Sequence, residues 1–342
     1  MLRTPLCELL GIRVPLIQAG MSVYTSPELA AAVSTAGALG SLGAWRRPPD
    51  QLRSDLTELR AATGRPFAVN HVVPDLDAEA FEITLDARPA LVSFALDDAG
   101  ELMQRVHDVG SLVMQQVTTV PQAEAAAASG ADVIVAQGHE AGGYGGTVTT
   151  LTLVPQVVDA VAPIPVVAAG GIADGRGLAA ALMLGAAGVN LGTRFLASRE
   201  APVGEGWKQA IVDAACDGWS QLGFWNDAFP TPGEHGYGTR VRALRTGFTE
   251  RWEARRDELR RDPAVMLAEL EAAEEAGTID ELIVVGGQSA GLIEEVLPAA
   301  EIVERSRPRP QRSSLEHRRS SGDQLRRDRC AARQADAGLA TE

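Results

Sequence analysis

Short apolar runs recur along the first 193 residues, and each is followed by an alanine-rich or amphipathic stretch. The runs are continuous rather than alternating, which is typical of strands buried on both faces of a parallel sheet. Eight such units in about 190 residues predict a (β/α)8 TIM barrel rather than an open doubly wound sheet. The predicted strands are residues 14–19, 38–43, 67–72, 90–95, 112–117, 132–137, 165–170 and 188–193.

The pattern changes after residue 195, which we take as the end of a barrel spanning 1–195. Residues 196–280 contain a helical stretch at 206–219, an aromatic segment at 219–237 and charged helices at about 249–261 and 263–277. We expect a small added α-rich subdomain here, whose aromatic side chains cap the barrel, pack as core or form an interface. Residues 281–304 return to an apolar run, a glycine turn and a helix, and we expect them to pack back on the barrel.

Residues 305–342 contain ten arginines and five acidic residues with few large apolar side chains, which predicts a disordered basic tail. The whole chain has a formal charge of −14, which argues against a nucleic-acid partner. Glu8, Arg13 and two prolines interrupt the apolar N-terminus, so we expect neither a signal peptide nor a membrane span, and a cytoplasmic location. Three widely spaced cysteines argue against a zinc site, and no metal is expected.

Glycines cluster where the predicted strands end. In barrels of this type the loops after the seventh and eighth strands often bind phosphate, and here these loops span residues 168–177 and 190–195. Their glycines let a ligand approach the backbone closely. We therefore predict a phosphate site, with tight turns as the alternative, at Gly170, Gly171, Gly192 and Thr193.

The stretch GQSAG at 287–291 has the form of a hydrolase nucleophile elbow. Such an enzyme needs a histidine later in the chain, and the only later one is His317, in the predicted disordered tail. We therefore do not expect Ser289 to be a nucleophile.

Six blocks, taken in order, resemble the nitronate monooxygenase family, formerly called 2-nitropropane dioxygenases. They are residues 15–21, 26–43, 67–70, 135–143, 165–195 and 286–303. The resemblance implies an FMN-dependent barrel that oxidises alkyl nitronates with O2 to carbonyl compounds and nitrite. Relatives in the same superfamily include NAD(P)H-dependent enoyl-ACP and quinone reductases.

The resemblance also implies a set of flavin-binding residues. Asn70, Gln137 and Gly142 would contact the flavin, and Gln18 and Met21 would line the first loop beside its ring. Gly171, Asn190, Gly192 and Thr193 would hold the FMN phosphate. Each has a structural alternative: Asn70 as a strand-end polar group, Met21 as core, and Gln137 as a hydrogen-bonding group inside the barrel.

The stretch VAQGHEAGGYGG at 135–146 departs from the family at its tyrosine. Well-studied members have EAGGH, with that histidine as catalytic base, whereas this chain has EAGGY, ending in Tyr144. Tyrosine has a reference pKa near 10, so it is a poor base but a good hydrogen-bond donor. We therefore expect Tyr144 to bind a substrate oxygen, with nitronate oxidation retained and oxidation of neutral nitroalkanes weak.

His139, on the same loop, and His71, after Asn70, are the candidates to replace the lost base. A stray polar histidine is the alternative for each. The main functional prediction is a nitronate monooxygenase acting on a small substrate and O2. The alternatives are an NAD(P)H-dependent FMN reductase of quinones or enoyl thioesters, and a flavin-binding module with little turnover. The physiological substrate and the oligomeric state stay open.

Overall fold

Eight parallel strands form one sheet in the order β1, β9, β8, β6, β5, β4, β3, β2. A parallel bridge between Ile17 and Leu39 brings the two edges of this sheet together. The strands are β1 (Leu16–Gln18), β2 (Gly40–Gly43), β3 (Phe67–Val72), β4 (Leu91–Ala95), β5 (Leu112–Val117), β6 (Val133–Gln137), β8 (Val166–Ala169) and β9 (Gly188–Leu191). The predicted (β/α)8 barrel is confirmed, and each predicted strand matches an observed one within two residues at either end.

This computed structural model describes residues 3–228 and 240–307, and the chain up to Arg307 makes one compact unit. Of the tail predicted at 305–342, the first three residues are described: Arg305 ends the helix Ala299–Arg305, and Ser306 is buried. Residues 308–342 lie outside the described residues. Within the described ranges no helix is both long and apolar enough to cross a membrane.

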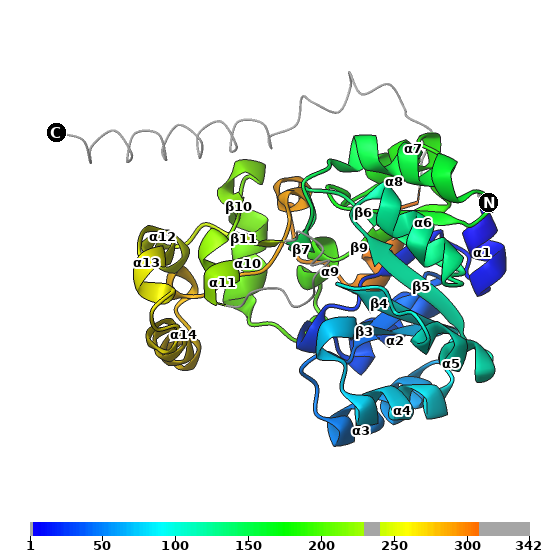
Figure 1. The fold of residues 1–342 in the computed structure, drawn as a ribbon, viewed down its shortest axis with the longest axis horizontal. Helices are drawn as coiled ribbons and strands as arrows, with labels where there is room; N and C mark the ends of the chain where they lie inside the picture. Colours follow the sequence, from blue (N-terminus) through cyan, green and yellow to red (C-terminus); the bar gives the residue numbers. More distant parts are fainter. Residues whose placement is uncertain (1–2, 229–239, 308–342) are drawn as a thin grey trace. The chain divides into compact units, whose positions relative to one another are not determined.

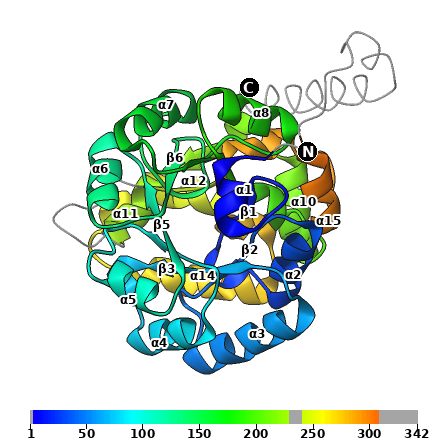
Figure 2. The same cartoon turned by 90° about the vertical axis from the view of Figure 1, so that its right-hand side faces the viewer.

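Helices surround the barrel (Figure 2). Those that follow the strands are α2 (Pro27–Ala36), α3 (Pro49–Ala62), α4 (Ala78–Ala87), α5 (Leu102–Asp108), α6 (Val120–Ala128), α7 (Thr150–Val161), α8 (Gly175–Met183) and the short α9 (Thr193–Leu196). Local signals set their ends. In α2, for example, Ser26 accepts a hydrogen bond from the Leu29 amide at 3.2 Å, and Gly37 ends the helix at φ +99°.

The barrel is closed at its amino-terminal end by α1 (Pro5–Leu10), whose Leu6 and Leu10 pack with interior residues such as Ile17 and Val167. Gly188 fits under this plug, because a Cβ there would lie 2.5 Å from Leu6 Cδ2. A ligand can therefore reach the barrel interior only from the carboxyl ends of the strands, where barrel enzymes build their sites.

A second lobe follows α9 (Figure 1). It contains α10 (Glu205–Asp213), β10 (Trp219–Gln221), α11 (Gly223–Ala228), β11 (Arg240–Leu244), α12 (Gly247–Ala254), α13 (Arg256–Leu259) and α14 (Ala264–Ala276). Phe224, Phe248 and Trp252 are fully buried in its core. The helix predicted at 206–219 ends at Asp213, where the chain turns extended and then enters β10.

The lobe is tied to the barrel by a small antiparallel sheet in the order β10, β11, β7. Strand β7 (Gly143–Gly145) lies in the loop after β6, and its Tyr144 pairs with Val241 of β11. This sheet was not predicted from the sequence. It carries the Gly-rich loop of the barrel onto the lobe, so that both parts contribute to one site.

After α14 the chain runs back to the barrel. After 3-10 turns at Ile279–Glu281 and Gln288–Leu292, it forms α15 (Ala299–Arg305), whose Ile302 and Val303 join the barrel core. The predicted division into a 1–195 barrel and a 196–280 subdomain stays a prediction.

Candidate active site

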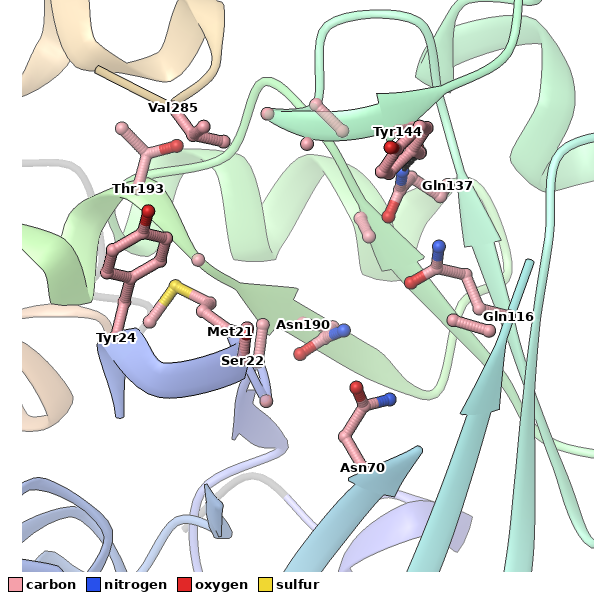
Figure 3. Close-up of a pocket in the computed structure, with 18 of the residues that line it drawn as sticks. Met21, Ser22, Tyr24, Asn70, Gln116, Gln137, Tyr144, Asn190, Thr193 and Val285 are labelled. Atoms are coloured by element: carbon pink, nitrogen blue, oxygen red, sulfur yellow. Dashed lines mark hydrogen bonds between the residues drawn. The ribbon is translucent and has the colours of Figure 1, made fainter. Parts of the chain in front are cut away.

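One cavity of about 330 Å³ opens at the carboxyl ends of the barrel strands. Four amide side chains point into it from different strands: Asn70 from β3, Gln116 from β5, Gln137 from β6 and Asn190 from β9 (Figure 3). Apolar lining comes from the barrel and also from Trp225, Leu270, Ile283 and Val285, farther along the chain. A few polar groups among apolar side chains are typical of a cofactor and small-molecule site.

The lining is almost free of formal charge. Among the described residues it contains no histidine, carboxylate, lysine or cysteine, and its only charged side chain is that of Arg46. Its other ionisable groups are the phenols of Tyr24 and Tyr144. Within the described ranges no cluster of three metal-ligating side chains occurs either. The described part of the lining therefore offers hydrogen bonds but no side chain that takes up a proton readily near neutral pH.

All of the predicted cofactor residues line this one cavity. They are Gln18, Met21, Asn70, Gln137, Gly142, Gly170, Gly171, Asn190, Gly192 and Thr193. Their roles toward a cofactor stay predictions. They differ in which of their polar atoms are already hydrogen-bonded within the protein.

Gln18 is completely buried, and its amide is used within the protein. Its Oε1 accepts from the Ser41 amide at 2.9 Å, and its Nε2 donates to the Ala19 carbonyl. Asn70 lines the cavity, and its Nδ2 donates to Ser93 Oγ at 2.9 Å. Gly20 is required beside it, because a Cβ there would lie 2.3 Å from Asn70 Cβ.

Asn190 has a buried oxygen without a partner. Its Oδ1 makes no hydrogen bond in the described structure, and the same holds for Ser41 Oγ, which also lines the cavity. A buried polar atom left unsatisfied costs about 1–3 kcal/mol. Two such atoms in one cavity indicate that a ligand with complementary polar groups completes the site.

The phosphate-type loops are built for close backbone approach. Gly170 and Gly171 have φ of +100° and +73°, a region that favours glycine. Glu140 fixes the neighbouring loop, since one of its oxygens accepts from both the amide and the hydroxyl of Thr150 at 2.9 Å. Thr193 Oγ1 accepts from the Gly287 amide at 2.9 Å, which joins the loop after β9 to the returning chain.

Tyr144 lines the cavity from β7 and is held at both ends. Its hydroxyl oxygen accepts a hydrogen bond from Trp225 Nε1 at 3.0 Å, and its backbone carbonyl accepts one from Gln137 Nε2 at 2.5 Å. With its oxygen already accepting from the indole, the phenol keeps its own proton for donation. The geometry matches a hydrogen-bond donor to a bound substrate oxygen.

His139 does not line the cavity. Its Nδ1 lies 3.0 Å from the Gly146 carbonyl and its Nε2 lies 2.9 Å from Arg242 Nη2. Since the guanidinium can only donate, Nε2 must accept and Nδ1 must carry the hydrogen, which describes a neutral ring. A further proton on Nε2 would face the buried Arg242 cation, so this geometry gives no support to His139 as the replacement base.

His71 is a core histidine. It is 2 % exposed, its Nε2 lies 2.9 Å from Thr84 Oγ1 of α4, and its ring packs against Phe81. Burial lowers the pKa of His71 to about 4. The side chain points to the helix layer, away from the cavity, so His71 is excluded as a base acting on a substrate there.

The other candidates are also placed. Ser289 lines the cavity on the 3-10 turn Gln288–Leu292, and among the described residues no histidine contacts it. It therefore lacks the histidine partner of a hydrolase nucleophile. Of the aromatic insert, Trp219 and Phe224 are core and Trp225 lines the cavity. Phe229 and Tyr237 lie outside the described residues.

Comparison with known proteins identifies the family of this chain. The family model described as nitronate monooxygenase matches residues 3–82 and 77–306. The chain belongs to the nitronate monooxygenase family.

Curated relatives carry two kinds of name. A Mycobacterium tuberculosis protein named "(3aS,4S,5R,7aS)-5-hydroxy-7a-methyl-1-oxo-octahydro-1H-indene-4-carboxyl-CoA dehydrogenase" is 42% identical over 220 residues, 64% of this chain and 62% of that protein. A Staphylococcus saprophyticus protein named "Probable nitronate monooxygenase" is 34% identical over 258 residues, 61% of this chain and 72% of that protein. The chain thus matches about three fifths of the length of the first relative.

Two solved structures share the fold of this chain. FabK from Thermotoga maritima is 34% identical with a TM-score of 0.79, covering 90% of this chain and 95% of that one. Nitroalkane oxidase from Streptomyces ansochromogenes is 30% identical with a TM-score of 0.75, covering 88% and 96%. Each match covers nearly the whole of both chains, so this shared fold includes the barrel and the lobe together.

Sequence reasoning missed several lining residues. Gln116 and Ser93 lie on strands whose polar positions were not singled out, and Tyr24 lies on the 3-10 turn Ser22–Tyr24. Backbone strain is concentrated here as well. Four non-glycine residues have positive φ in the described structure, and three of them line the cavity: Ser22, Arg46 and Leu96. Such strain is often found at functional sites.

Proposed function

We propose that this chain is an FMN-dependent nitronate monooxygenase that converts alkyl nitronates and O2 to carbonyl compounds and nitrite. The observation that carries the proposal is the composition of the cavity: a phenol positioned to donate, and no side-chain base among the described lining residues. A nitronate is already an anion, so its oxidation does not require the protein to remove a carbon-bound proton. A neutral nitroalkane does require that step.

The described residues fit a flavin. Asn190 Oδ1 and Ser41 Oγ are buried and without protein partners, as expected if a bound ring or phosphate completes their hydrogen bonds. Asn70 and Gln137 would face the ring, and the backbone at Gly170, Gly171 and Gly192 would surround the phosphate. When bound, FMN supplies the electron acceptor for the substrate.

The chain's own residues then bind and orient the nitronate. The Tyr144 hydroxyl donates to a nitronate oxygen while Trp225 fixes the phenol from the other side. Hydrogen bonds to charged groups are worth about 1.5–3 kcal/mol. The apolar side chains of Leu270, Ile283 and Val285 keep water from that oxygen and strengthen the contact.

The test compares the two protonation states of one substrate. Preformed propyl nitronate and neutral 1-nitropropane are supplied separately, and O2 consumption and nitrite release are measured at pH 7. We expect turnover of the nitronate and at least a hundredfold lower kcat/KM for the neutral compound. Equal rates on both would show that a base acts in this site and would overturn the proposal.

A second candidate is oxidation or reduction of an acyl thioester. The M. tuberculosis relative, named as a carboxyl-CoA dehydrogenase, favours it because it is 42% identical. In the reducing direction Tyr144 would donate to the thioester carbonyl, and NAD(P)H would be the electron donor. Anaerobic bleaching of the flavin by NADPH but not by a nitronate would favour this candidate. Flavin content without turnover on any donor would indicate a binding module.

A further inference from the structure

Arg46 occupies a backbone position that favours glycine. It is the third residue of a turn over residues 44–47, in which the Arg47 amide donates to the Ala44 carbonyl at 3.0 Å, and its φ is +59°. A positive φ at this turn position normally selects glycine or asparagine. A long cationic side chain therefore stands at a position where the backbone conformation favours glycine.

The residues on both sides of Arg46 are fixed. Ser22 Oγ donates to the Trp45 carbonyl at 2.8 Å, and Trp45 Nε1 donates to Asp75 Oδ2 at 3.2 Å. The buried Arg47 donates to the Gly43 carbonyl at 2.9 Å and pairs with Asp55. These contacts determine the turn without any contribution from the Arg46 side chain.

The Arg46 side chain is exposed at the cavity and is not neutralised. Its guanidinium carbon lies 4.5 Å from the centroid of the Trp45 ring, a cation–π contact that fixes the group in place. In the described part of the chain Arg46 has no ion pair, whereas the exposed Arg105 and Arg305 pair with glutamates. The nearby carboxylates of Asp75 and Asp55 are taken up by Trp45 and Arg47.

We infer that Arg46 binds an anionic group, a carboxylate or a phosphate, carried by the substrate at a distance from its reacting atoms. This rests on the proposed function, because the reacting end is taken to lie at Tyr144. Arg46 is the only formal charge among the described lining residues, and it stands in a chain of net charge −14. The substrate would thus have a reacting end at Tyr144 and a second, anionic end at the turn after β2.

The first test uses two nitronates that differ in one charge: propyl nitronate, and the nitronate of 3-nitropropanoate, which also carries a carboxylate. We expect the ratio of their kcat/KM values to fall at least tenfold, against the carboxylated substrate, in Arg46→Gly and Arg46→Gln. Arg46→Lys should lose less. Arg53→Gln, which removes an exposed arginine from α3 outside the cavity lining, is the matched control and should leave the ratio unchanged.

Stability separates a binding role from a structural one. Because the turn favours glycine, Arg46→Gly should melt no lower than the wild-type protein while losing the preference. A lower melting temperature with both nitronates affected equally would show that Arg46 only supports the loop, and would overturn the inference.

If neither nitronate is oxidised, the proposed function fails, but the inference about Arg46 can still be tested by a binding measurement. Titration calorimetry of the holoprotein with coenzyme A and with 3-nitropropanoate measures phosphate and carboxylate recognition separately. Tenfold weaker binding of either probe to Arg46→Gly supports the inference and identifies the anion. Unchanged binding of both, or no binding to the wild-type protein, overturns it.

Discussion

The indole nitrogen of Trp225 donates a 3.0 Å hydrogen bond to the hydroxyl oxygen of Tyr144, the residue at which the family resemblance predicts a histidine. This contact joins α11 of the lobe to β7 of the barrel loop at the wall of the cavity. It leaves the phenol as a donor. The site is thereby suited to substrates that arrive with a negative oxygen.

Replacing Tyr144 should separate binding from proton removal. Tyr144→Phe loses one hydrogen bond to a charged oxygen, so we expect kcat/KM for propyl nitronate to fall by about 10- to 150-fold, from 1.5–3 kcal/mol. Tyr144→His supplies a base that titrates near neutral pH. We expect it to raise the rate on neutral 1-nitropropane at least tenfold, measured as O2 uptake.

The control for this pair is Trp225→Phe, which removes the orienting N–H and should cost less than Tyr144→Phe. If Tyr144→Phe keeps full activity on the nitronate, the phenol does not bind the substrate oxygen.

Removing His139 should leave the pH dependence of catalysis unchanged. Both ring nitrogens are engaged, one with the Gly146 carbonyl and one with Arg242 Nη2. His139→Ala is expected to lower the free energy of unfolding, because the buried Arg242 loses an acceptor, a loss typically worth about 1–3 kcal/mol. The kcat/KM profile between pH 6 and 9 is the decisive measurement, and loss of an ionisation from that profile would restore His139 as a base.

Asn190 should matter to the flavin more than to the fold. Its Oδ1 is buried without a partner in the described structure, so Asn190→Ala removes an unsatisfied acceptor and should not destabilise the apoprotein. If this oxygen accepts from FMN, the variant should bind FMN about 2- to 12-fold more weakly, from a net 0.5–1.5 kcal/mol. Quenching of flavin fluorescence gives the affinity, and urea unfolding of the apoprotein gives the stability. Unchanged FMN affinity together with a less stable apoprotein would show that Asn190 is purely structural.

His71 predicts an acid-sensitive fold. Burial lowers its pKa from 6.5 to about 4, so between these values the unfolded chain binds more protons than the folded one. Stability therefore falls as pH drops through 6.5, and the loss is complete below about 4. We expect His71 to contribute a loss of about 2 kcal/mol between pH 7.5 and pH 5.

Urea unfolding of the wild-type protein and His71→Gln at both pH values checks this estimate, because the variant lacks the ionisation and should show the smaller pH dependence. An identical dependence in the two proteins would refute it.

The barrel was predictable because its signals are local. Each strand is a continuous apolar run buried on both faces, and residues such as Ser26 and Gly37 mark helix ends within a few positions. Strand β7 was not predictable, because the partner of Tyr144 is Val241 on β11, far along the chain. The helix predicted at 206–219 was wrong in its second half: the chain is extended at Ala214, forms a 3-10 turn at Cys216–Gly218 and enters β10 at Trp219, which pairs with the distant Leu244.

The site residues that lie in family motifs at strand ends were predictable. Residues were harder to predict where the direction of the side chain decides whether it faces the cavity. Successive residues of a strand face opposite sides. Since Asn70 faces the cavity, His71 must face the helices, and this argument was available from the sequence. Gln116 was missed although it alternates with the outward-facing Gln115 in the same way. The partner of His139, Arg242, lies on another lobe and leaves no local signal.

The measurement that tests the central claim most directly is the absorbance spectrum of the purified protein during anaerobic mixing with propyl nitronate. We predict the spectrum of a bound flavin, bleached by the nitronate and left unchanged by neutral 1-nitropropane. A colourless protein, or a flavin that NADPH bleaches and the nitronate does not, would contradict the account.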